Sequence, residues 1–110
     1  MKKVAILFGN DKYDFSNAQL QCAVNDAESL QEKLDALSFE TKSILNSDTK
    51  TMAMEIANFE TTLSNYDVGL FFFAGHGFQF DGLNYLAATD TSFADDRSAA
   101  YTSFRLDDII

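Results

Sequence analysis

The sequence predicts an α/β fold: a doubly wound, mostly parallel sheet with helices on both faces. Two uninterrupted apolar runs, residues 4–8 and 68–74, are typical of strands that are buried on both faces of a parallel sheet. Segments in which apolar residues recur at helical spacing stand between the predicted strands. This alternation of strand and helix is the pattern of a sheet whose strands are joined by crossover helices.

The first part of the chain is expected to contain a strand, a helix and a second strand. Residues 4–8 form the first strand, and a polar, turn-like segment follows it. Leucines and an alanine at helical spacing then predict a helix from about residue 26 to 37, with Asn25 or Asp26 as its N-cap. Residues 39–45 are half apolar and predict a shorter second strand.

A second helix is expected after a loop, with Thr49 or Thr51 as its N-cap. Its apolar face is marked by four residues at helical spacing: Met52, Ile56, Phe59 and Leu63. The apolar run at residues 68–74 is the strongest strand signal in the chain. Residues 78–85 then alternate apolar and polar around Asp81-Gly82, which predicts a small hairpin after the third strand.

The remaining segments are expected to be a loop and the start of a third helix. Residues 88–103 have an irregular pattern, and residues 106–110 resemble the opening turn of a helix. Because residues 68–74 are the most apolar strand, we expect them at the centre of the sheet, with a partner on each side. Only two other main strands are available, and three strands leave an apolar edge exposed. The sheet is therefore expected to be incomplete.

Composition and charge exclude several classes of function. The chain has 8 Lys and Arg against 17 Asp and Glu, a net charge of −9. Without a basic patch, neither nucleic acid nor an anionic membrane surface is expected as a partner. One cysteine excludes an internal disulfide framework and a multi-cysteine zinc site. The longest apolar run is too short to cross a bilayer and signal-peptide features are missing, so the expected location is cytoplasmic.

His76 is the only histidine, and it stands between Gly75 and Gly77 directly after the most apolar predicted strand. Doubly wound sheets bind their ligands at the carboxyl ends of the strands. An imidazole in that position can act as a general base near neutral pH. The alternative from position alone is that His76 is a polar residue that ends a strand.

Three stretches together resemble one family. Residues 72–86 read FFAGHGFQFDGLNYL, residues 4–13 read VAILFGNDKY, and residues 23–27 read AVNDA. They are similar to the histidine segment, the first strand with its turn, and the first helix start of the caspase/metacaspase superfamily of cysteine peptidases. Residues 38–41 resemble the turn into that family's second strand. The style is that of the bacterial caspase-like proteins, and the resemblance extends to about Asp90.

The resemblance implies roles for three residues. His76 is similar to the catalytic histidine, which acts on a cysteine thiolate. The backbone N–H of Gly77 is similar to one donor of the oxyanion hole. Asp26 matches the acidic residue that, in metacaspases, lines the pocket for the side chain before the scissile bond, which implies a preference for Arg or Lys. The alternative for Asp26 is a plain helix cap.

The nucleophile of this family is missing, because no cysteine follows His76. In caspases the histidine lies about 50 residues before the Gln-Ala-Cys segment. Residues 1–110 are therefore expected to be the N-terminal part of a caspase-like peptidase domain, truncated before the catalytic-cysteine strand and inactive alone. The expected partners are a protein or peptide substrate and the remainder of the domain. Cys22 is expected to behave as a small hydrophobe, not as the nucleophile.

Two other functions stay open. A non-catalytic caspase-fold interaction or scaffold module is disfavoured because it has no physical need for His76, Gly77 and Asp26 together. A receiver-type or nucleotide-binding domain is disfavoured because the third strand does not end in aspartate and no phosphate-binding glycine motif is present. No cofactor is expected, although the resemblance leaves a calcium site near Asp107-Asp108 open, with too few identifiable ligands.

Overall fold

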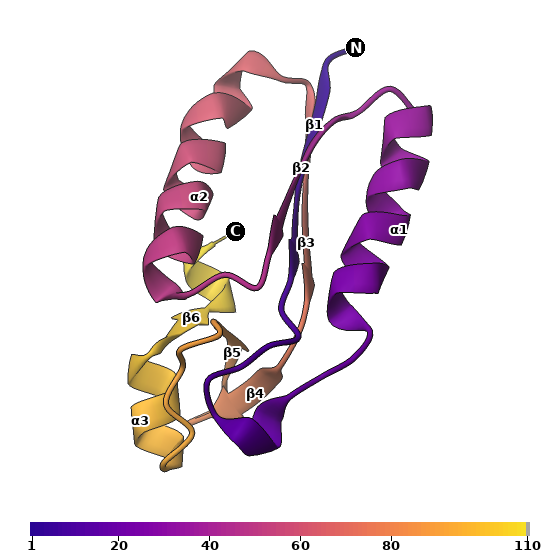
Figure 1. The fold of residues 1–110 in the computed structure, drawn as a ribbon. Helices are drawn as coiled ribbons and strands as arrows, with labels where there is room; N and C mark the ends of the chain where they lie inside the picture. Colours follow the sequence, from indigo (N-terminus) through magenta and orange to yellow (C-terminus); the bar gives the residue numbers. More distant parts are fainter. Residues whose placement is uncertain (110) are drawn as a thin grey trace.

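The structure, a computed structural model, describes residues 1–109 and contains two sheets. Figure 1 shows the arrangement, with the larger sheet between two long helices and the smaller sheet at one end of it. In chain order the elements are β1 (Lys3–Gly9), α1 (Ala23–Ala36), β2 (Glu40–Leu45), α2 (Thr49–Thr62), β3 (Val68–Ala74), β4 (Gly77–Phe80), β5 (Leu83–Ala87), α3 (Asp96–Tyr101) and β6 (Ser103–Arg105). None of the helices in residues 1–109 has the length and apolar composition needed to span a membrane.

The larger sheet confirms the predicted fold class. Its three strands are parallel in the order β2-β1-β3, and Ile6 of β1 lies opposite Lys42 on one side and Phe71 on the other. In Figure 1, α1 covers one face of this sheet and α2 covers the opposite face. The chain therefore winds in both directions from β1, and the carboxyl ends of all three strands point toward the smaller sheet.

The core explains why the β1 sequence is apolar without alternation. Ala5 and Leu7 face α1 and pack with its Ala27 and Leu34, whereas Ile6 and Phe8 face α2 and pack with its Met52 and Ile56. Successive side chains point to opposite faces of a strand, so a strand covered on both faces needs apolar residues at every position. Leu7 and Phe8 are accordingly 0% exposed.

The position expected for the third strand is wrong. β1 occupies the centre, and β3 pairs only with β1 among residues 1–109. The crossover through α2 carries the chain past β1 to its other side, so the connection and not the apolarity of the strand sets the order. As a result, the three phenylalanines of β3, Phe71, Phe72 and Phe73, are only partly buried.

The start of α1 also differs from the prediction. The helix begins at Ala23, so Asp26 lies in its first turn and neither Asn25 nor Asp26 is the N-cap. The capping group is instead the carboxylate of Asp11, which accepts the N–H groups of Ala23 at 2.7 Å and Val24 at 3.0 Å. A side chain from the turn after β1 thus satisfies donors that a local cap usually satisfies.

The cap of α2 is Asp48, not Thr49 or Thr51 as expected. Its carboxylate accepts the N–H of Thr51 at 2.8 Å. This hydrogen bond lowers the pKa of Asp48 below its usual value, because it stabilises the charged form. Asp90, from the segment after β5, accepts the N–H of Thr49 at 2.7 Å. The first turn of α2 is therefore tied to the smaller sheet as well as to its own loop.

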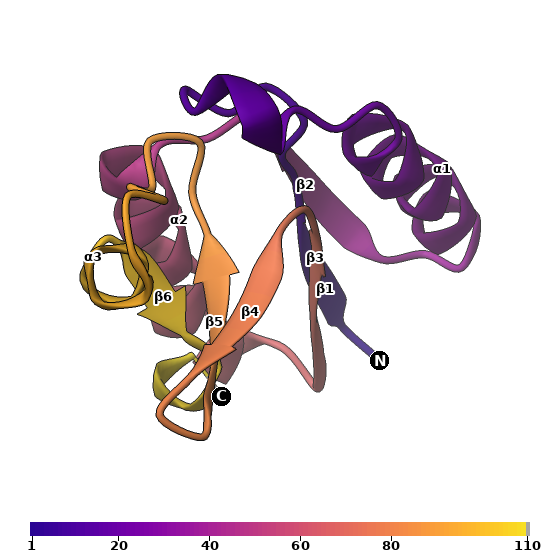
Figure 2. The same ribbon diagram turned by 90° about the horizontal axis from the view of Figure 1, so that it is seen from below.

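The smaller sheet is antiparallel, in the order β4-β5-β6. The predicted hairpin is confirmed: Asp81 and Gly82 form its turn with φ angles of 54° and 77°, the left-handed conformation that such two-residue turns need. The irregular loop expected at residues 88–103 is wrong, because this segment contains α3 and reaches β6. Residues 106–108 form a short 3₁₀ helix, and residue 110 of the expected third helix lies outside the described residues. Figure 2 shows this sheet with α3 beside it, on the same side as α2.

Candidate active site

His76 lies in the short connection between β3 and β4, where the two sheets meet, and is partly buried. Its ring nitrogen Nε2 is 2.7 Å from the carbonyl oxygen of Ala18, in the 3₁₀ helix Ser16–Ala18. A carbonyl oxygen can only accept, so Nε2 must carry the proton in this contact. In the neutral ring Nδ1 then keeps its lone pair, so it is the ring nitrogen that can accept a proton.

Tyr13, in the turn after β1, holds the other side of His76. Its hydroxyl accepts the backbone N–H of His76 at 2.9 Å, and its ring meets the imidazole edge to face at a centroid distance of 4.8 Å. Phe93, in the segment after β5, also packs edge to face with the imidazole, at a centroid distance of 5.9 Å. Tyr13 is 2% exposed, and this burial raises the pKa of its phenol.

Gly77 presents its backbone N–H at the free edge of the smaller sheet. The N–H of Ala87 donates to the carbonyl of His76 at 2.9 Å, so these two residues stand opposite each other in the hydrogen-bonding position directly before the first pair of the ladder. Hydrogen-bonded positions alternate with positions that are not hydrogen-bonded, so at the next pair, Gly77 with Leu86, the N–H of Gly77 points away from β5. Gly77 belongs to edge strand β4 and is exposed.

The two glycines beside His76 serve different purposes. A Cβ on Gly75 lies 2.6 Å from the hydroxyl of Tyr13 and 2.8 Å from the ring of Phe73, too close for any side chain without movement. A Cβ on Gly77 approaches only a carbonyl oxygen of Tyr85, at 3.6 Å. Gly75 is therefore required by the packing under His76, whereas Gly77 leaves space on the exposed side.

A hollow of about 420 Å³ lies between the end of β3 and the start of α1, and it reaches Gly75, the residue before His76. Its lining joins these two elements: Leu20, Gln21, Cys22, Ala23, Asp26, Phe73, Ala74 and Gly75. The structure thus brings Asp26, from the first turn of α1, to the same hollow as the residue before His76. Asp26 is exposed. Cys22 is also exposed, so the expectation that it behaves as a small hydrophobe is wrong.

The sequence profile of the caspase domain family matches residues 2–110. The chain belongs to the caspase domain family. A comparison with curated protein sequences finds no match. This membership gives the caspase domain a function of the cysteine-peptidase type, and proteins or peptides as the class of substrate.

Two side chains that the sequence did not single out organise this end of the caspase domain. Asn10, 0% exposed, accepts the N–H of Ser47 at 2.8 Å and donates to the carbonyl of Ala87 at 3.3 Å. Asn46 accepts the N–H groups of Asp11 at 3.0 Å and Lys12 at 3.1 Å. These bonds join the ends of β1, β2 and β5. Their only sequence signal was a polar residue directly after an apolar strand, which does not reveal its partner.

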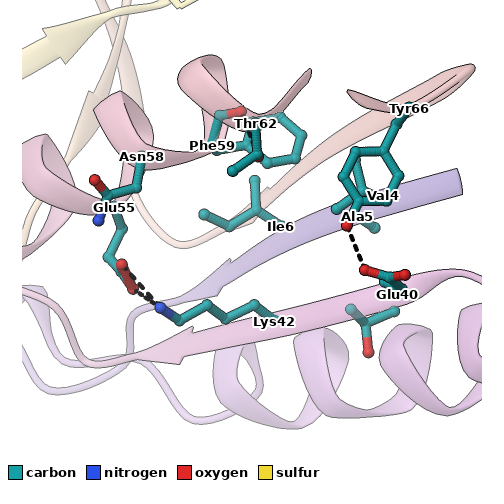
Figure 3. Close-up of a pocket in the computed structure, with 11 residues that line it drawn as sticks. Val4, Ala5, Ile6, Glu40, Lys42, Glu55, Asn58, Phe59, Thr62 and Tyr66 are labelled. Carbon is teal, nitrogen blue, oxygen red and sulfur yellow. Dashed lines mark hydrogen bonds and ion pairs between the residues drawn. The ribbon is translucent and has the colours of Figure 1, made fainter. Parts of the chain in front are cut away.

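A second hollow of the caspase domain, about 260 Å³, lies between α2 and the larger sheet. In Figure 3 the Lys42–Glu55 ion pair, at 2.7 Å, is at one end and the hydrogen bond from Tyr66 to Glu40 is at the other, with Ile6 between them. None of the residues predicted to have a catalytic or binding role lines this hollow. It is separate from the site at His76.

The acidic residues near the end of the chain do not fit a calcium site. Within residues 1–109, no three His, Cys, Asp or Glu side chains come together as metal ligands. The carboxylate of Asp108 instead binds the guanidinium of Arg105 at 2.8 Å. Calcium takes six to eight oxygen ligands, and Asp107 with Asp108 supplies too few.

Proposed function

We propose that this caspase domain is the histidine-bearing part of a cysteine endopeptidase, with His76 as the general base and acid. The observation that carries the proposal is the contact of His76 Nε2 with the carbonyl of Ala18 at 2.7 Å. It fixes a ring whose Nδ1 is free to accept a proton. A cysteine outside residues 1–110 supplies the nucleophile. Without it, residues 1–110 are expected to be inactive.

In the proposed reaction His76 first accepts a proton and later donates it. Nδ1 of His76 takes the proton from the cysteine thiol, and the thiolate attacks the carbonyl carbon of the scissile peptide bond. The carbonyl oxygen becomes an oxyanion, and the outward N–H of Gly77 is one of its donors. The protonated imidazole then gives its proton to the leaving amine as the carbon–nitrogen bond breaks. Water hydrolyses the resulting thioester and returns the cysteine.

The free edge of β3 is where we expect the cysteine to arrive. Among residues 1–109, β3 pairs on one side only, and its phenylalanines are partly exposed. An apolar strand with an unpaired edge favours the addition of another strand. Since parallel strands end at the same edge of a sheet, a residue at the carboxyl end of such a strand comes next to the connection that holds His76. The added strand belongs to the remainder of the peptidase domain.

Asp26 is proposed to select Arg or Lys before the scissile bond. Asp26 lines the same hollow as Gly75, the residue before His76. A cationic side chain in this hollow forms a charge-assisted hydrogen bond with the carboxylate. The net charge of −9 also favours the approach of cationic peptides. The proposal includes the cytoplasmic location, which the use of a single cysteine favours.

The decisive experiment compares two variants of the full-length protein on peptides with Arg or Lys before the cleaved bond. His76→Ala is expected to lower kcat by roughly 10²–10⁴-fold, because the base is lost. Cys22→Ala is expected to keep cleavage, although Cys22 is the only thiol in residues 1–110. Circular dichroism checks that both variants are folded. Full turnover by folded His76→Ala means that another group is the base, and loss of turnover in folded Cys22→Ala points to Cys22 as the nucleophile. Either result contradicts this mechanism. A folded wild-type protein that does not cleave these peptides favours the non-catalytic module.

A further inference from the structure

The backbone ladder between β4 and β5 ends at the pair Gly77 and Leu86, next to His76. A hydrogen-bonded antiparallel pair exchanges two bonds, and here only one is present, from the N–H of Ala87 to the carbonyl of His76 at 2.9 Å. The N–H of His76 instead donates to the hydroxyl of Tyr13 at 2.9 Å, and that hydroxyl donates to the carbonyl of Ala87 at 3.3 Å. The phenol oxygen therefore lies at the end of the ladder, between the N–H of His76 and the carbonyl of Ala87, and bridges the two groups.

The Tyr13 hydroxyl is buried between the backbone of Ala87 and Gly75. Tyr13 is 2% exposed and Ala87 is 0% exposed. Asn10 donates to the same Ala87 carbonyl at 3.3 Å, so this oxygen has two donors. On the side of β3, the missing side chain of Gly75 leaves the space that the hydroxyl needs, since a Cβ there lies 2.6 Å from it.

We propose that Tyr13 is a positioning residue for His76, which acts through its hydroxyl wedge between the backbones of His76 and Ala87. The wedge sets the distance at which the His76 backbone passes β5. The phenol ring, edge to face with the imidazole at 4.8 Å, sets the plane of the ring. Together they keep Nε2 on the Ala18 carbonyl and leave Nδ1 for the thiol. The consequence for catalysis rests on the proposed function, whereas the effect on the imidazole does not.

Tyr13→Phe isolates the hydroxyl because it keeps the ring. Without the oxygen, the N–H of His76 has two options. It stays unpaired in a buried place, or it bonds directly to the Ala87 carbonyl and draws His76 toward β5. The first option removes one anchor of the His76 backbone, and the second option moves this backbone. Both are therefore expected to loosen the contact of the imidazole with Ala18. The exposed Tyr101, 78% accessible in α3, offers the matched control Tyr101→Phe.

The first test measures the imidazole directly, in full-length protein labelled with ¹⁵N-histidine. The signals of His76 are those that disappear in His76→Gln. In the wild type and in Tyr101→Phe, the neutral ring is expected to be protonated at Nε2, whereas Tyr13→Phe is expected to show both tautomers. Wild-type ring signals in folded Tyr13→Phe overturn the proposal. If that variant does not fold, Gly75→Ala replaces it, because the added methyl group crowds the Tyr13 hydroxyl. This variant is also expected to show both tautomers, and wild-type ring signals in it overturn the proposal.

The second test is kinetic. A displacement of the reacting group by about 1 Å costs roughly 10²-fold in rate, so Tyr13→Phe is expected to lower kcat by roughly 10- to 100-fold. KM stays unchanged, because Tyr13 does not line the hollow beside Asp26. Wild-type kcat in Tyr13→Phe refutes the positioning role. An inactive wild-type protein instead contradicts the proposed function, and the tautomer measurement then decides on the wedge alone.

Discussion

The carboxylate of Asp11 accepts the backbone N–H of Ala23 at 2.7 Å, so the turn after β1 caps α1. Its second oxygen accepts the N–H of Val24 at 3.0 Å. Gly9, at the end of β1, permits this close approach, because a Cβ there lies 2.8 Å from the carbonyl oxygen of Ala23. The first turn of α1 carries Asp26, so the position of this acid in the hollow depends on Asp11.

Asp11→Ala is expected to lower the free energy of unfolding by about 1–2 kcal/mol, the usual cost of losing an N-cap. Asp11→Asn is expected to lose less, because the amide keeps one acceptor oxygen. Urea denaturation followed by circular dichroism measures both. Asp14→Ala, an exposed aspartate in the same turn, is the control for the loss of one negative charge. Equal stability of Asp11→Ala and Asp14→Ala argues against the cap.

Asp26→Asn distinguishes two ways of selecting a cationic substrate. Either Asp26 binds the Arg or Lys side chain in the hollow, or the acidic surface as a whole attracts the peptide. If Asp26 pairs with the substrate, the variant lowers kcat/KM for Arg and Lys peptides by roughly tenfold, the loss of one charge-assisted hydrogen bond at an exposed site. The matched control is Glu28→Gln, the same change in charge at an exposed position of α1 that does not line the hollow. Similar losses in both variants point to long-range attraction and refute the pocket role of Asp26.

The sequence predicted most of the larger sheet because its signals are local. Residues 4–8 are apolar without alternation, and both faces of β1 are indeed covered. The Asp81-Gly82 turn was equally readable, since few residue pairs adopt positive φ. Strand order was not readable from composition, because it depends on how the α2 crossover passes β1.

In the candidate site, the sequence could point only to residues whose side chains have a recognisable chemistry. His76 stood out as a lone imidazole between glycines. Its orienting partner is the backbone carbonyl of Ala18, an atom that every residue has and that no sequence pattern marks. Tyr13 and Asp11 act across long stretches of chain, through contacts that only the folded turn after β1 creates.

The buried phenol of Tyr13 is expected to make stability depend on alkaline pH. Burial, the main cause, raises its pKa in the folded protein, and the carboxylate of Asp11 adds to the effect. In the unfolded chain a tyrosine titrates at about pH 10. The unfolded state therefore releases its proton first as the pH rises. Stability from this group is complete below about pH 10 and is lost as the pH rises from there through the folded pKa.

Urea denaturation at a series of pH values from about 8 to 11 measures this effect as a slope. In Tyr13→Phe the unfolding free energy is expected to fall less steeply with rising pH than in the wild type. This difference in slope is expected even if the variant is less stable at neutral pH. Tyr66 needs its own control, because the hydrogen bond to Glu40 raises the pKa of its phenol as well. Tyr66→Phe removes only the contribution of Tyr66 to the pH dependence, since Tyr66 lines the hollow between α2 and the larger sheet and not the site at His76. An equally steep fall in wild type and Tyr13→Phe means that the Tyr13 phenol is not buried in the neutral form. The hydroxyl wedge then loses its support.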